Sequence, residues 1–118
     1  VLDQVRRRVQ GLGLHERGLE AEVRMPMNMP GFETDPDSAL VRAAGAAVRQ
    51  AGGPDLPVGG WTAACDGGFL AQDGNMPVVV LGPGSVTEQA HRPNESVSLE
   101  ELHTAARTYA LIALNLLG

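Results

Sequence analysis

The chain has 118 residues and a net charge of -5, and its nine basic residues are all arginines. The one basic run, Arg6 to Arg8, fits the solvent-facing side of a helix, so the chain offers no basic face to nucleic acid. No apolar stretch is long enough to span a bilayer, and the single cysteine, Cys65, cannot form an internal disulfide, which together predict a cytoplasmic protein without membrane contact.

The first 30 residues predict a helix, a strand and a link. Apolar residues recur at helical spacing over residues 1–9, until Gly11 and Gly13 stop the pattern. Residues 19–25 alternate apolar and charged side chains, as in a strand with one buried face. Two prolines and a glycine within residues 26–31 mark a domain boundary. The chain begins in mid-pattern without an initiator methionine, so we expect it to be the carboxyl part of a longer protein.

Two longer helices are predicted after residue 31. Asp35-Pro36 fits an N-cap and a first helical position, and an apolar stripe follows over residues 40–48. Ser98 opens a capping box in front of the longest helical pattern, residues 99–117. The broad apolar face of this last helix is expected to lie on a sheet, with His103 at its surface.

The segments between these helices have strand character. Residues 56–61 fit a short strand or an extended link, and the apolar run of residues 76–81 fits a buried strand after a turn. Strands that alternate with helices predict an α/β layer structure with mainly parallel pairing.

A run of small residues surrounds Asp66, from Thr62 to Leu70. Such a run indicates that a neighbouring element or a ligand approaches the main chain closely. Asp66 has two interpretations that the sequence leaves open. It is either the N-cap of a short helix through Ala71, or a side chain that faces a site, with Thr62 or Cys65 beside it.

The loop between the apolar run and the last helix is the strongest candidate for chemistry. Gly82-Pro83-Gly84-Ser85 lacks the lysine and the glycine spacing of a phosphate-binding loop, which disfavours a phosphate site. His91 follows in a loop stiffened by Pro93, at the place where open α/β sheets carry functional side chains. Glu95, four residues on, is positioned to reach back and orient the imidazole. A lone histidine in a loop is also a common structural residue, so a non-catalytic α/β binding or assembly module remains the alternative.

These motifs, in this order, resemble the carboxyl end of a metallopeptidase family. The family contains acetylornithine deacetylase, succinyl-diaminopimelate desuccinylase, aminoacylase and the glutamate carboxypeptidases. The resemblance rests on Asp66 in its small-residue turn, the apolar run that ends in Gly82-Pro83-Gly84, the segment from Ala90 to Val97, and the capping box at Ser98. It covers residues 56–118 closely. Residues 1–30 are similar, more loosely, to the last helix and strand of the family's α+β lid, or dimerisation, domain.

The resemblance implies a hydrolase with two zinc ions, or cobalt or manganese in their place, that cleaves a linear amide in N-acyl amino acids or small peptides. Residues 31–118 would be the carboxyl-terminal portion of its layered α/β catalytic domain. His91 corresponds to the last histidine ligand of the metals. The other ligands and the general-base glutamate would lie in the amino-terminal half of the same protein, so the 118 residues alone are expected to be inactive.

The resemblance also implies roles for the residues around His91. Thr62 and Asp66 would line the substrate pocket, Gly82 and Gly84 would offer main-chain donors or room, and Glu95 would hold the His91 loop. The lid would provide a surface for a homodimer. Many relatives carry an arginine two positions after the aspartate, where this chain has Gly68, so substrate preference does not transfer with the resemblance.

Overall fold

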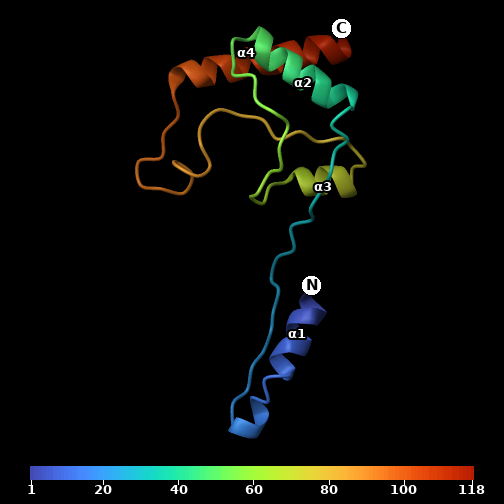
Figure 1. Cartoon of the computed structure of the whole chain (residues 1–118), viewed down its shortest axis with the longest axis vertical. Coiled ribbons are helices and arrows are strands. Elements are labelled where there is room, and N and C mark those ends of the chain that lie inside the picture. Colours follow the sequence, from blue (N-terminus) through green and yellow to red (C-terminus); the bar gives the residue numbers. More distant parts are fainter.

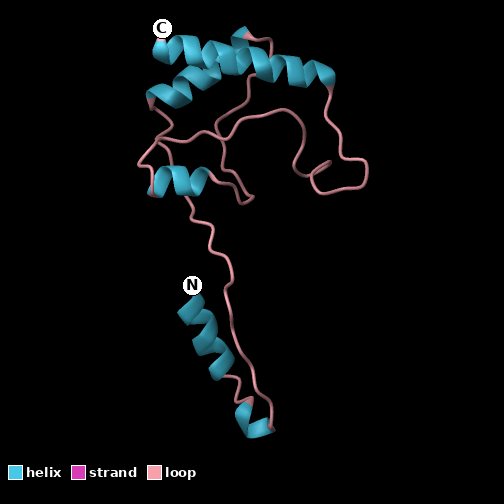
Figure 2. Cartoon of the chain, turned by 180° about the vertical axis from the view of Figure 1, so that it is seen from behind, coloured by secondary structure: helices cyan, strands magenta, loops and turns pink.

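The computed structural model describes all 118 residues, and its regular structure consists of helices alone (Figures 1 and 2). In chain order these are α1 (Leu2–Gln10), a single 3-10 turn (His15–Arg17), α2 (Ala39–Gln50), α3 (Gly67–Gln72) and α4 (Leu99–Leu117). The expected helices at the start, middle and end of the chain are confirmed, and so is the short helix after Asp66.

The amino-terminal arm lies apart from the rest of the molecule. α1 ends at Gln10, as the glycine at position 11 predicts, and none of its residues is buried. Residues 19–30 then run as an extended chain back toward the body (Figure 1). The expected strand over residues 19–25 has the extended conformation but no hydrogen-bonded partner, so it does not form a sheet here.

The core lies between α2 and α4, which are the only two helices that pack against each other. Small side chains on both helices allow this close approach. Ala47 is fully buried, and Thr108 satisfies its buried hydroxyl by donating to the carbonyl oxygen of Thr104 at 2.8 Å. The buried residues of the pair are Val41, Ala44, Ala47, Ala51, Ala105 and Thr108. Only Ala105 and Thr108 of α4 are buried, and most of its apolar face, including Leu102, Tyr109 and Leu116, is exposed, so the expectation that this face lies on a sheet stays a prediction.

Serine side chains cap the start of both long helices. The hydroxyl of Ser98 accepts hydrogen bonds from the main-chain N–H groups of Glu100 and Glu101, as the capping box predicts. The predicted start of α2 is wrong. Asp35 instead accepts a hydrogen bond from the N–H of Asp37 in a separate turn, and the helix starts after Ser38, whose hydroxyl accepts from the N–H of Val41.

Side-chain hydrogen bonds tie residues 30–34 to α3 and to the apolar run of residues 76–81. The hydroxyl of Thr34 donates to the carbonyl oxygen of Val78 at 2.6 Å and accepts from its N–H at 3.1 Å. The side-chain amide of Gln72 donates to the carbonyl oxygen of Gly31 at 2.7 Å. The hydroxyl of Tyr109 on α4 donates to the carbonyl oxygen of Leu81 at 2.9 Å. Residues 76–81 are therefore held at both ends without a neighbouring strand.

The molecule is far more open than a globular chain of its size. Its radius of gyration is 20.2 Å, whereas about 13 Å is typical for 118 residues. Its accessible surface is 9516 Å², against about 6,100 Å² for a compact protein of this mass. A sheet needs partner strands that these residues do not supply, so the layered α/β architecture is not confirmed and stays a prediction.

Candidate functional site

The loop that carries His91 begins at Ser85, which organises its first half. The carbonyl oxygen of Ser85 accepts hydrogen bonds from the N–H groups of Gln89 at 2.9 Å and Ala90 at 3.3 Å. Its hydroxyl accepts from the N–H of Glu88 at 3.2 Å. One serine thus fixes a turn of backbone immediately before the histidine.

Arg92 closes the second half of the loop on the first. Its guanidinium donates to the carbonyl oxygen of Thr87 at 3.0 Å, and its N–H donates to that of Gln89 at 3.3 Å. The carbonyl oxygen of Arg92 in turn accepts from the N–H of Glu95 at 3.2 Å. Every one of these bonds joins two residues between 85 and 95, so the loop holds its shape with its own atoms.

His91 has an unusual backbone conformation, and its imidazole ring makes no hydrogen bond. Its φ angle is +61°, in the left-handed region that a non-glycine residue seldom adopts, and Asn94 has the same value. The residue is exposed, and its imidazole takes part in none of the hydrogen bonds or ion pairs of the structure. Both ring nitrogens are therefore available to a ligand.

Glu95 contacts His91 through the main chain and not through the ring. Its carboxylate oxygen Oε2 accepts a hydrogen bond from the main-chain N–H of His91 at 3.2 Å. This bond agrees with the expectation that Glu95 holds the His91 loop, whereas direct orientation of the imidazole by its carboxylate is not seen here. Glu95 therefore acts on the chain conformation at His91 and leaves the ring free.

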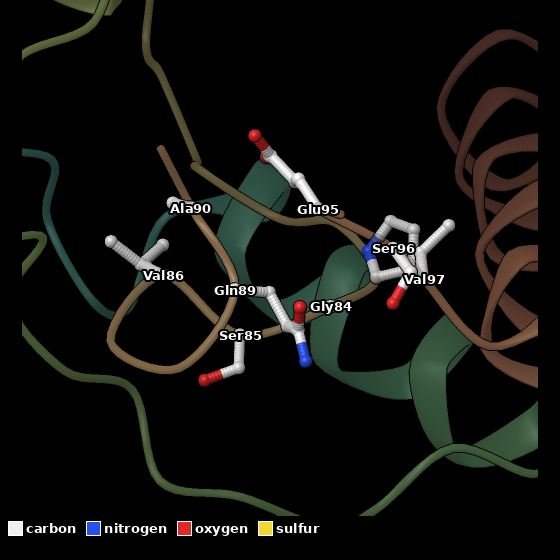
Figure 3. A pocket seen from close by; sticks show the side chains of 9 residues that line it. Gly84, Ser85, Val86, Gln89, Ala90, Glu95, Ser96 and Val97 are labelled. Atoms are coloured by element: carbon white, nitrogen blue, oxygen red, sulfur yellow. The ribbon is translucent and has the colours of Figure 1, made fainter. Parts of the chain in front are cut away.

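Two hollows lie on either side of the Gly82-Pro83-Gly84 turn. The first, of about 290 Å³, is open to solvent and is lined by the loop itself, with Glu95 and Ser85 on opposite sides of the view (Figure 3). The second, of about 270 Å³, is lined by Trp61 and the end of the apolar run. Pro83, Gly84 and Val86 contribute to both.

The structure brings together only part of the predicted site. Gly84 and Glu95 line the first hollow and Gly82 and Gly84 the second, whereas His91, Asp66 and Thr62 line neither. Trp61 lines the second hollow although no motif points to it, because it comes from a segment some twenty residues before the turn. Ser85 lines the first hollow, next to the glycines that the resemblance assigns to the substrate side.

Asp66 lies directly before α3 and is exposed, and its side chain makes no capping hydrogen bond. The glycines after it are buried for a structural reason. A Cβ on Gly67 would lie 2.9 Å from the ring of Phe32 and from Val78, and one on Gly68 would overlap the carbonyl oxygen of Pro30. A neighbouring segment of the chain therefore accounts for the small residues on this side of Asp66.

A complete metal site is not formed by these residues alone. No group of three or more histidine, cysteine, aspartate or glutamate side chains is close enough to hold a metal ion. Structural zinc takes about four protein ligands and catalytic zinc about three. The exposed imidazole of His91 is suited to be one ligand of such a site, with the other ligands supplied by other residues.

Comparison with known proteins gives a consistent result. The sequence profile of Peptidase family M20/M25/M40 matches residues 4–115. Succinyl-diaminopimelate desuccinylase of Alkalilimnicola ehrlichii is 35% identical over 118 residues, which is 98% of this chain and 30% of that protein. The enzyme of the same name from Nitrosomonas europaea is 35% identical over 118 residues, which is 98% of this chain and 30% of that protein. The one from Hydrogenovibrio crunogenus is 36% identical over 88 residues, which is 73% of this chain and 22% of that protein.

The chain thus spans less than a third of the length of these curated relatives. No solved structure matches it significantly. None of its helices combines the length and the hydropathy that crossing a membrane requires.

Proposed function

Because the chain belongs to Peptidase family M20/M25/M40, we propose that it is the carboxyl-terminal part of a metal-dependent amidohydrolase. The proposed reaction is hydrolysis of a linear amide in an N-acyl amino acid or a small peptide. The relatives are named for removal of a succinyl group from succinyl-diaminopimelate, which makes N-succinyl amino acids the first substrates to test.

The observation that carries this proposal is the state of His91. Its imidazole is exposed and free of internal hydrogen bonds, and it projects from a loop that its own atoms hold rigid. We assign His91 as one ligand of a two-zinc centre, with cobalt or manganese as alternatives. Such a centre supplies an activated water and polarises the scissile carbonyl. The remaining ligands and the general base are assigned to the amino-terminal half of the same polypeptide.

Residues near the loop are proposed to bind the substrate. Gly82 and Gly84 border the two hollows, where their main-chain groups are within reach of a small polar ligand. Thr62 and Asp66 are exposed and have no internal partner that would occupy them. We assign these four residues to substrate binding.

The proposal extends to the architecture. We assign residues 1–30 to the end of a lid domain that provides a homodimer surface, and residues 31–118 to the end of an α/β catalytic domain. The main-chain groups of Val79 and Val80, within the extended run of residues 76–81, have no hydrogen-bond partner, which suits a strand of a sheet and supports this assignment. The single, unpaired Cys65 supports a cytoplasmic location.

The test is zinc analysis and hydrolysis assays on the protein that joins this chain to its amino-terminal half. His91→Ala is expected to lower the bound zinc and to reduce hydrolysis of N-succinyl and N-acetyl amino acids by at least about 100-fold, since a metal ligand is lost. His103→Ala is the matched control, because His103 is an exposed histidine on α4. Unchanged zinc and unchanged hydrolysis in His91→Ala would favour a non-catalytic binding or assembly module.

A further inference from the structure

His91 makes a single hydrogen bond of its own. The residue adopts a left-handed backbone at φ +61°, although it carries a full side chain. Residues in such conformations persist only where the surrounding structure fixes them. The hydrogen bond from the His91 N–H to Oε2 of Glu95, at 3.2 Å, is the only one that any atom of His91 makes.

The other hydrogen bonds of the loop bypass His91. They join Ser85 to residues 88–90, Arg92 to Thr87 and Gln89, and Glu95 to Arg92. None of these bonds uses an atom of His91, although the bond from the Arg92 N–H to the carbonyl oxygen of Gln89 closes a turn in which His91 is the third residue. Glu95 is thus the one side chain that ties the backbone of His91 to the loop.

We propose that Glu95 is a positioning residue that sets the direction of the His91 side chain through the main chain, and this inference rests on the proposed function. With the left-handed conformation fixed, the Cα–Cβ bond leaves the loop in one direction and the imidazole enters the metal site from a defined side. Both ring nitrogens stay free, because the Glu95 carboxylate binds the main-chain N–H of His91 and not the ring. In this role Glu95 needs a side-chain oxygen that reaches the His91 N–H and accepts its hydrogen bond. Its negative charge is not required.

Substitutions at position 95 separate these two contributions. Glu95→Gln keeps an acceptor oxygen of the same reach and removes the charge, whereas Glu95→Ala removes both. Glu88→Ala is the matched control, because Glu88 lies in the same exposed loop and its carboxylate has no partner in the structure. Zinc affinity is measured by competition with a chromophoric chelator, in the protein that joins this chain to its amino-terminal half.

Glu95→Ala is expected to weaken zinc binding about tenfold, at the low end of the range for residues that support a metal ligand. Glu95→Gln and Glu88→Ala are expected to bind zinc within about twofold of the unmodified protein, as substitutions that leave a ligand's support in place do. The absorption bands of the cobalt-substituted protein report the ligand geometry, and they should change in Glu95→Ala alone. Equal weakening by Glu95→Ala and Glu95→Gln would overturn the proposal in favour of a charge effect.

A double substitution tests whether Glu95 acts through His91. In the His91→Ala background, Glu95→Ala should cause no further loss of zinc affinity, because the side chain that it positions is gone. A further loss of similar size would overturn the proposal. If His91→Ala weakens zinc binding and Glu95→Ala does not, the positioning role fails and the metal assignment stands. If His91→Ala changes nothing, the proposed function fails and this inference fails with it.

Discussion

Gly68 lies where the link at Pro30 crosses α3, and it leaves no room for a side chain. A Cβ at this position would overlap the carbonyl oxygen of Pro30, a main-chain atom that no rotamer change can move. Gly68→Ala is therefore expected to destabilise the protein by about 1–3 kcal/mol, the usual range for overpacking a closed site. The unfolding temperature of the protein that joins this chain to its proposed amino-terminal half measures this loss of stability.

Gly59→Ala is the matched control for this prediction. Gly59 is exposed, its φ angle is not positive, and an added Cβ would meet nothing within 4 Å. Its replacement by alanine should be neutral or slightly stabilising, because the unfolded chain loses freedom. Equal unfolding temperatures for the two variants would show that the crossing at Pro30 does not persist in solution.

Residue-level features of the site were only partly readable from the sequence. The proximity of Glu95 to His91 follows from their spacing of four, and it is confirmed. The atom that Glu95 contacts does not follow, because nothing in the sequence signals a left-handed conformation at a histidine. The glycines after Asp66 predicted a close approach, but its source, the link at Pro30, is more than thirty residues away in the chain.

At the scale of elements, the contact between α2 and α4 depends on small side chains. Ala47 has no exposed surface, whereas Ala46, one position earlier on α2, is exposed. Ala47→Leu is expected to push the helices apart and lower the free energy of unfolding by about 1–3 kcal/mol, because three extra carbon atoms must be placed in a closed interface. Urea unfolding of the protein that joins this chain to its proposed amino-terminal half, followed by circular dichroism, measures this change.

Ala46→Leu is the control for the helix contact. It adds the same atoms on the solvent side of α2, and leucine has a helix propensity close to that of alanine. Its stability should stay within about 0.5 kcal/mol of the starting protein, as is usual for surface substitutions. A loss in Ala46→Leu as large as that in Ala47→Leu would mean that the helices meet through another face.

Some elements could be predicted better than others, because some are determined by neighbouring residues and others by partners far away in the sequence. α4 is specified by local signals, a capping serine at Ser98 and helical spacing of apolar residues, and it appears where they place it. The start of α2 was misplaced by three residues, because Asp35 and Ser38 are both good caps and only the structure selects between them. Residues 19–25 and 76–81 have strand patterns, but a strand exists only with a partner, and the pattern does not say where that partner lies.

At the scale of the whole molecule, the chain exposes surface that a stable protein would cover. Its accessible area exceeds the value for a compact chain of this mass by roughly 3,400 Å². An excess of this size on one partner alone is larger than one side of most permanent, apolar interfaces. Many of the exposed side chains are large and apolar, among them Trp61 at the end of residues 56–61 and Met76 and Val80 on residues 76–81. We therefore expect the 118 residues to reach a compact state only against a further covering surface, which in the proposed function is the amino-terminal half of the same protein.

Residues 1–118 on their own should behave as an expanded chain. Small-angle scattering should give a radius of gyration near 20.2 Å or larger, and urea unfolding should be shallow, because its slope scales with the surface buried on folding. Addition of the separately produced amino-terminal half should shift the emission of the single tryptophan, Trp61, to shorter wavelength as the apolar run beside the second hollow is covered. A steep unfolding transition together with a radius near 13 Å for the isolated chain would contradict this, since a compact chain would have no excess surface to cover.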